Sequence, residues 1–189
     1  MKVVRREFAS VPQIAALNAK SSGLIDEAIT ELRPVFRDYQ ERVRLLYRPR
    51  MIGILADGLT PSEASDVAEF YRSDLGRRVM GLASRNYSPD ATIGGIAQLT
   101  ESEEFEAAQE DIEMDLRAAT NAVMKEMRDE DFSAVARLMQ EKPALLKLNA
   151  INPKILEMRT QMENEQPNEQ ELARIDSTIE RVFSKRLGN

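Results

Sequence analysis

Apolar residues recur every three or four positions along most of the sequence, and this periodicity limits the folds that the chain can adopt. One stripe with helical spacing comprises Val35, Phe36, Tyr39, Val43, Leu46 and Tyr47. A longer stripe runs from Phe105 to Met127 with the same spacing. No segment has the alternation of apolar and polar residues that is typical of a half-buried strand. We therefore predict an all-α protein, a compact bundle of about seven to nine antiparallel helices.

Capping motifs predict where several of these helices begin. The stretch Thr60-Pro61-Ser62-Glu63 combines an N-cap, a proline in the first turn and the glutamate of a capping box. A second capping box, Thr100-x-x-Glu103, predicts that the longest helix of the protein spans residues 101–128. We expect this long helix to form the spine of the bundle.

Prolines predict where helices end in the second half of the chain. We expect breaks at Pro143, at Asn152-Pro153 and at Gln166-Pro167. A final helix is predicted over residues 168–187, before Gly188. We expect the whole chain, residues 1–189, to form a single helical domain.

A weak internal similarity suggests an old duplication. Residues 67–71 align with residues 135–139, and a turn that contains proline follows each copy. The related halves would be residues 24–98 and 99–165, each a set of helices and turns. The alternative is that two amphipathic helices resemble each other by chance, and the sequence leaves both open.

Three residue types are absent, and their absence excludes much of the chemistry that helical proteins perform. The chain has no Cys, no His and no Trp. The chain therefore lacks the residues that form several common sites. These are zinc sites, thiol nucleophiles, Ser-His-Asp relays and di-iron sites with Glu-x-x-His motifs. We predict no catalytic residues, no metal and no cofactor. A hydrolase that uses carboxylates is the remaining enzymatic alternative.

Charge and hydropathy bear on the partners and on the location. The net charge of −6 is uneven, with +2 over residues 1–100 and −8 over residues 101–189. This argues against nucleic acid as a partner. The longest apolar run, around residues 51–56, is too short for a transmembrane segment. The chain also begins without a signal peptide, so we expect either a cytoplasmic protein or a mature form with an added Met1.

A segment near the middle of the first half resembles a known family. Leu59-Thr60-Pro61-Ser62-Glu63 is followed by Ala68-Glu69-Phe70-Tyr71-Arg72-Ser73-Asp74-Leu75-Gly76-Arg77-Arg78. This stretch resembles the bacterial all-helical family called domain of unknown function 2059, which carries Phe-Tyr-x-Ser-Pro-x-Gly followed by two basic residues. Asp74 stands where the family usually has proline, and both residues suit the start of a helix.

The resemblance implies an α-helical domain of unknown biochemistry that lies behind a signal peptide in Gram-negative bacteria. It therefore implies a periplasmic or secreted protein, and it supplies no catalytic residues. From the residues themselves we expect a structural role for Phe70, Tyr71, Ser73 and Gly76. The two rings would wedge neighbouring surfaces, Ser73 would cap a helix, and Gly76 would allow close helix packing.

Two charged surfaces are candidate binding sites. Arg37, Arg44 and Arg48, with Arg33 beside them, lie along one arc of a helix and could bind anions or an acidic partner. An acidic run follows later in the chain, at Glu101, Glu103, Glu104, Glu106, Glu110, Asp111, Glu113 and Asp115. These surfaces could pair within a chain or between chains. The alternative for both is an ordinary solvated or salt-bridged face.

Methionines in the second half allow two readings, core filling or an adaptable groove for apolar ligands. They are Met114, Met124, Met127, Met139, Met158 and Met162.

We predict a non-catalytic interaction or structural module that acts outside the cytoplasm through a protein partner or self-association. The alternative from another class is a carrier of a lipid or other apolar ligand in a pocket between helices.

Overall fold

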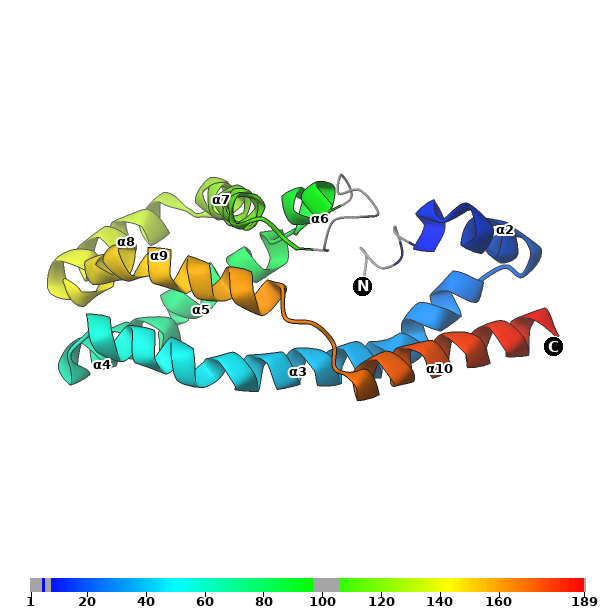
Figure 1. Cartoon of the computed structure of the whole chain (residues 1–189). Helices are drawn as coiled ribbons and strands as arrows, with labels where there is room; N and C mark the ends of the chain where they lie inside the picture. Colours follow the sequence, from blue (N-terminus) through cyan, green and yellow to red (C-terminus); the bar gives the residue numbers. More distant parts are fainter. Residues whose placement is uncertain (1–4, 6–7, 97–105, 189) are drawn as a thin grey trace. The chain divides into compact units, whose positions relative to one another are not determined.

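The computed structural model describes residue 5, residues 8–96 and residues 106–188. This part of the chain forms nine helices and no strand, which confirms the prediction of an all-α bundle (Figure 1). The helices are α2 (Pro12–Lys20), α3 (Leu24–Gly58), α4 (Pro61–Arg72), α5 (Asp74–Asn86), α6 (Asp90–Ile96), α7 (Gln109–Glu126), α8 (Asp129–Glu141), α9 (Ala144–Glu163) and α10 (Glu169–Leu187). Among the described helices, none is both long enough and apolar enough to span a membrane.

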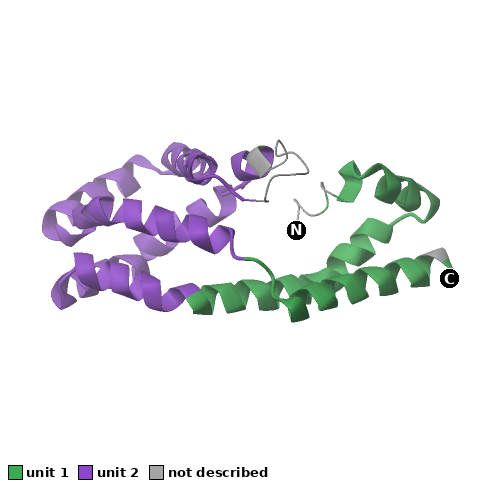
Figure 2. Cartoon of the chain, viewed as in Figure 1, with its two compact units in different colours: residues 1–46, 166–189 green, residues 47–165 purple. Residues whose placement is uncertain are grey.

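The chain divides into two compact units (Figure 2). Unit 1 consists of residues 1–46 and 166–189, and unit 2 consists of residues 47–165. Helix α3 contributes its first part to unit 1 and its last part to unit 2. These units differ from the halves 24–98 and 99–165 suggested by the internal similarity. The single domain and the duplication both stay predictions.

Unit 1 has a small apolar core. Leu24 and Ala28 of α3 pack against Val182 of α10, and all three are buried. Phe8, Leu17 and Phe183 pack around this cluster. The core fixes which faces of α3 and α10 meet.

A ladder of ion pairs then sets α3 and α10 antiparallel. As the residue number increases along α3, the residue number of the ion-pair partner in α10 decreases. The pairs are Glu27 with Lys185 and Arg186, Glu31 with Arg181, Asp38 with Arg174, and Arg42 with Glu171. Because Glu171 is buried while most of the other partners are exposed, the Arg42–Glu171 pair contributes more than the rest.

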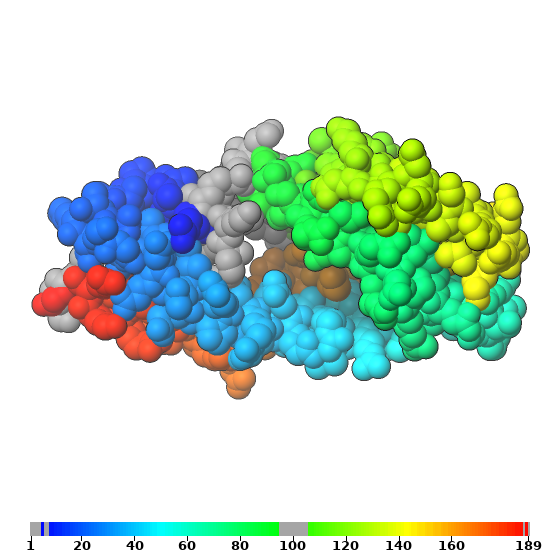
Figure 3. All heavy atoms as spheres, turned by 180° about the vertical axis from the view of Figure 1, so that it is seen from behind, coloured from blue at the N-terminus to red at the C-terminus, as the bar shows by residue number. Residues whose placement is uncertain are grey.

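Unit 2 is held together by α9 and α5. Helix α9 packs against α4, α7 and α8, and α5 packs against the same three helices. Figure 3 shows α5, in green, crossing one face of this unit between α4 and the pair α7 and α8. One buried apolar cluster of unit 2 comprises Leu59, Val67, Ala144, Leu145 and Ile151.

The prediction of a helix over residues 101–128 is wrong in its bounds, and this helix is not the longest one described. The longest described helix is α3, with 35 residues, whereas α7 has 18 residues and begins at Gln109. Asn164 explains the late start. Its side-chain amide accepts a hydrogen bond from the N–H of Ala107 (2.7 Å) and donates one to the carbonyl of Ala107 (3.0 Å). These bonds hold the backbone groups of Ala107 outside a helix. The predicted capping box at Thr100 and Glu103 lies outside the described residues.

The predicted break at Asn152-Pro153 is also wrong. Pro153 lies inside α9, which continues to Glu163. A proline within a helix removes one backbone hydrogen bond and costs about 3 kcal/mol. Packing of α9 against three other helices outweighs this local cost. Pro34 likewise lies within α3.

Candidate functional site

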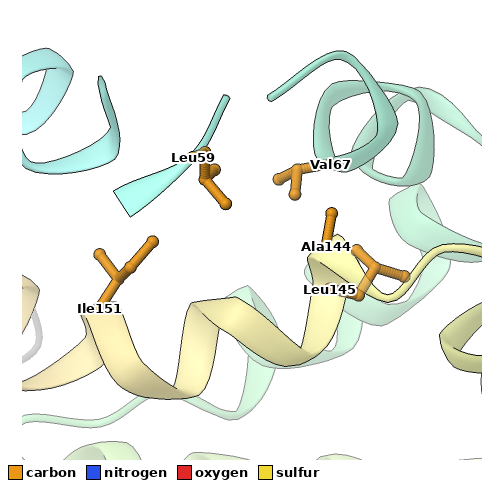
Figure 4. Packing of buried hydrophobic residues seen from close by; sticks show 5 residues of the cluster. All are labelled: Leu59, Val67, Ala144, Leu145 and Ile151. Atoms are coloured by element: carbon orange, nitrogen blue, oxygen red, sulfur yellow. The ribbon is translucent and has the colours of Figure 1, made fainter. Parts of the chain in front are cut away.

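Unit 2 contains an apolar groove between the end of α3 and helices α4, α8 and α9. Its volume is about 630 Å³, within the usual range for small-molecule sites. Its lining comprises Met51, Leu55, Leu59, Ala64, Val67, Ala68, Phe70, Tyr71, Val135, Met139, Leu145, Leu148, Asn149, Asn152 and Ile155. Figure 4 shows Leu59 and Val67 facing Ala144, Leu145 and Ile151 across the core beside this groove. We call this site the apolar groove.

The chemistry of the lining is simple. None of the lining side chains is charged, and the polar groups are the Tyr71 hydroxyl and the amides of Asn149 and Asn152. Such a lining binds by excluding water from apolar surface, and its few polar groups can orient a ligand.

The nearby charges are paired with one another. Lys142 donates to Asp66 (2.8 Å) and Glu69 (2.6 Å), and Lys147 lies 2.5 Å from Glu63. The acidic partners in these pairs belong to α4, which carries one wall of the groove. The pairs fix that wall and leave the groove itself neutral.

The capping box that the sequence predicts begins this wall. The Glu63 N–H donates to the Thr60 hydroxyl at 3.3 Å, and the Thr60 N–H donates to the Glu63 carboxylate at 2.9 Å. A hydrogen bond from Lys147, together with the Thr60 N–H, lowers the pKa of Glu63 to about 2. Glu63 therefore joins the start of α4 to α9 as an ionised carboxylate.

The motif at residues 70–76 has two parts with different surroundings. The Ser73 hydroxyl accepts from the Gly76 N–H (3.0 Å) and donates to the Phe70 carbonyl (2.6 Å). A Cβ at Gly76 would overlap that carbonyl, so the junction between α4 and α5 requires glycine. Phe70 and Tyr71 form an edge-to-face pair with ring centroids 5.2 Å apart. Both rings also line the apolar groove, a position that helical periodicity alone does not predict.

A second groove, of about 640 Å³, borders the first. Asn149, Asn152 and Ile155 line both grooves. The remaining lining residues are Gln109, Glu113, Leu116, Thr120, Pro153, Leu156 and Arg159. We call this site the arginine groove. The shared residues lie on one face of α9, because positions three and four apart are neighbours on a helix.

Arg159 is the most unusual residue of the arginine groove. Its guanidinium lies over the Tyr87 ring, 4.8 Å from the centroid, and its Nε lies 3.4 Å from a carboxylate oxygen of Glu163. This Nε is nevertheless buried without a hydrogen-bond partner among the described atoms. Burial raises the pKa of Tyr87, and the positive charge of Arg159 opposes that rise. No local pattern in the sequence distinguishes Arg159 from the other arginines.

Asp115 belongs to the structure of unit 2 and not to an acidic surface. It is buried and accepts hydrogen bonds from the N–H groups of Ala91 (2.8 Å) and Thr92 (3.0 Å) and from the Thr92 hydroxyl (2.6 Å). It thereby caps the first turn of α6 from the adjacent helix α7. Asp115 therefore has a structural role and is not part of an exposed acidic surface.

A second member of the acidic run is paired within its own helix. Glu113 pairs with Arg117 at 2.6 Å. Glu101, Glu103 and Glu104 lie outside the described residues. Across residues 8–96 and 106–188, no group of three or more acidic side chains is arranged to hold a metal ion.

The predicted arginine stripe lies on the exposed surface of α3. Arg44 donates two hydrogen bonds to the Glu41 carboxylate, of 2.8 Å and 2.5 Å. Arg37 lies 3.8 Å from Asp38. Arg48 is exposed. Because Arg37 and Arg44 belong to unit 1 and Arg48 belongs to unit 2, we describe them separately. A role for these three residues stays a prediction.

A more polar groove of about 610 Å³ lies between α5 and α8. Arg77, Arg78, Arg85 and Arg128 line it, together with carboxylates. Asp131 binds Arg78 at 2.6 Å and Arg128 at 3.4 Å, and these bonds lower the pKa of Asp131. Since most of this positive charge is already neutralised within the protein, the groove is a weaker candidate for a ligand site than the apolar groove.

The methionines divide between core, groove and surface. Met158 is buried, Met51 and Met139 line the apolar groove, and Met114 and Met124 are more than half exposed. Met158 thus fills the core, whereas a role of Met139 in binding an apolar ligand stays a prediction.

Together these features define a helical protein with an apolar groove in one of its two units. Residues 48–85 match the model of a family described as "Uncharacterized protein conserved in bacteria (DUF2059)". This confirms the resemblance predicted from residues 59–78, over a limited part of the chain. No curated protein and no solved structure matches the chain. The matched segment comprises the end of α3, helix α4 and most of α5, and it supplies the wall of the apolar groove from Met51 to Tyr71.

Proposed function

We propose that the protein is a non-catalytic binding protein that carries a lipid or another apolar molecule in the apolar groove of unit 2. The observation that supports this proposal most is the lining itself, a groove of about 630 Å³ without a charged side chain. The apolar groove shares Asn149, Asn152 and Ile155 with the arginine groove, and a long, narrow ligand could contact both. Carboxylates are absent from its lining, so the proposal includes no hydrolysis.

The location outside the cytoplasm is part of the proposal. It rests on the resemblance to the bacterial family alone. A carrier of apolar molecules has a clear use in an aqueous compartment between membranes, because apolar chains dissolve poorly in water.

The proposal is tested with dodecanol, a neutral molecule with one unbranched chain. Native mass spectrometry of the purified protein is expected to show one bound dodecanol. Replacing Ala68 with tryptophan fills the groove and is expected to abolish the adduct. Ser65→Trp is the matched control, because Ser65 is exposed on the same helix and does not line the groove.

Two results would contradict the proposal. One is the absence of a dodecanol adduct on the unmodified protein. The other is an adduct of equal strength on Ala68→Trp and Ser65→Trp, provided that circular dichroism shows both variants folded. That second result would place dodecanol elsewhere on the surface.

A protein partner is the second candidate. In unit 2, Ile52 of α3 is 56% exposed, and the exposed Arg48 lies one turn before it. An apolar residue beside an arginine is a common composition for the centre of an interface. Arg48→Glu is expected to abolish self-association in light scattering if this face binds a second copy. An unchanged oligomeric state would exclude the face from self-association.

A further inference from the structure

Arg159 indicates that the proposed ligand has a charged end as well as an apolar chain. The two neighbouring grooves differ in charge: the apolar groove has no charged lining residue, whereas the arginine groove has Glu113 and Arg159. Glu113 is already bound to Arg117 on the next turn of the same helix. Arg159 also has an acidic neighbour, Glu163 at 3.4 Å, but its Nε has no hydrogen-bond partner among the described atoms, so its guanidinium is the group in this groove that still has a donor for an anion.

We propose that the bound molecule is an anionic amphiphile with a single chain and a carboxylate head, such as a fatty acid. Its chain lies in the apolar groove, and its carboxylate is bound by Arg159. This inference rests on the proposed function, because it names the class of the apolar ligand. It also assigns Arg159 as the residue that recognises the head group.

The spacing along α9 suits such a ligand. Asn152, which lines both grooves, and Arg159 are seven residues apart, two turns of the same helix. They lie on one face, about 10 Å apart along the helix axis. A single chain can follow this face from the guanidinium to the apolar lining.

The surroundings of the guanidinium also suit a carboxylate. The flat group stacks on Tyr87, and this leaves its edges for hydrogen bonds. Glu163 approaches one edge at 3.4 Å, while Nε has no hydrogen-bond partner. A guanidinium has five N–H donors and binds a carboxylate through two parallel bonds. The groove of about 430 Å³ on which Tyr87 and Arg159 also border is lined mainly by apolar side chains, which strengthens such bonds.

The test measures the affinities of three proteins for dodecanoate and for dodecanol. Each molecule competes with a fluorescently labelled alkyl-chain probe for binding to the protein. The unmodified protein is expected to bind dodecanoate more tightly than dodecanol. In Arg159→Gln, affinity for dodecanoate is expected to fall about tenfold or more, while affinity for dodecanol stays unchanged. Arg137→Gln is the matched control, because it removes an exposed arginine of α8 in the same unit that lines neither groove, and it is expected to leave both affinities unchanged.

Two further variants address loss of the fold. Arg159→Lys keeps the positive charge and is expected to bind dodecanoate more tightly than Arg159→Gln does. Glu163→Gln removes the competing carboxylate and is expected to strengthen dodecanoate binding. Equal affinity for the two molecules in the unmodified protein and in Arg159→Gln would overturn this inference and leave the proposed function standing. Binding of neither molecule to the unmodified protein would overturn the proposed function itself.

Discussion

The N–H of Gly76 donates to the Ser73 hydroxyl at 3.0 Å, and this bond joins the end of α4 to the start of α5. Ser73 closes the junction from the other side by donating to the Phe70 carbonyl. The sharp connection places α5 against the end of α4 without a loop between them. Since Phe70 and Tyr71 directly precede it, the junction also holds the two rings that line the apolar groove.

Replacing Gly76 with alanine is expected to destabilise the protein. The new Cβ would overlap the Phe70 carbonyl, which belongs to the backbone and cannot move aside alone. The expected loss is about 1–3 kcal/mol in the free energy of unfolding, measured by urea denaturation. The control is Gly81→Ala in the same helix, where the nearest atom to a new Cβ is the flexible end of Arg85. That variant is expected to gain about 0.5–1 kcal/mol, and equal effects of the two changes would contradict this account.

Replacing Thr60 with alanine is expected to lower the free energy of unfolding by about 1 kcal/mol. The change removes the hydroxyl that accepts the Glu63 N–H at the start of α4. Ser62→Ala, two positions further along the same first turn, is the matched control, because Ser62 is exposed. A loss in Ser62→Ala as large as that in Thr60→Ala would show that the cap does not stabilise α4. Thermal unfolding followed by circular dichroism measures both.

Glu63 predicts a dependence of stability on pH. Its pKa is about 2 in the folded protein and about 4.5 when unfolded, so the unfolded state binds a proton first as the pH falls. The stabilisation is complete above about pH 5 and is lost as the pH falls toward 2. Other carboxylates contribute in the same direction, so the test compares urea unfolding of the unmodified protein and of Glu63→Gln at several pH values. The difference between the two is expected to shrink with acidification, and a constant difference would contradict the prediction.

In unit 1, the Arg42–Glu171 pair is expected to stabilise more than its neighbours in the ladder. Arg42 donates two hydrogen bonds to Glu171, at 2.9 Å and 3.0 Å, and the Glu171 side chain is only 8% exposed. Arg42→Gln would leave this carboxylate buried with fewer donors, and the expected loss is about 2 kcal/mol. Arg174→Gln breaks the exposed pair with Asp38 and is expected to cost about 0–1 kcal/mol. Urea denaturation separates these values, and equal losses would refute the ranking.

Local patterns predict the fold class and several helix starts, because both depend on residues close together in the sequence. The Thr60 and Glu63 box is an example, since its two members lie within one turn. The start of α7 could not be predicted in this way. It depends on Asn164, which binds Ala107 from 57 positions away. Pro153 also misleads local reasoning, because tertiary packing of α9 outweighs the preference of one residue.

The candidate site shows the same limit. Periodicity shows that Val67, Leu145 and Ile155 face inward, but it does not show that their helices leave a groove between them. Phe70 and Tyr71 were predicted as structural wedges, and only the position of α9 reveals that they also line a groove. Arg159 gave no signal at all, because a single arginine on a helix is unremarkable until its neighbours are known.

The most direct measurement is photo-crosslinking with a dodecanol that carries a diazirine on its chain, followed by peptide mapping. The account predicts cross-links to the lining of the apolar groove, above all to Met139, Leu148 and Ile155, and their loss in Ala68→Trp. Cross-links confined to exposed methionines such as Met114 and Met124, or cross-links that persist in Ala68→Trp, would contradict the account.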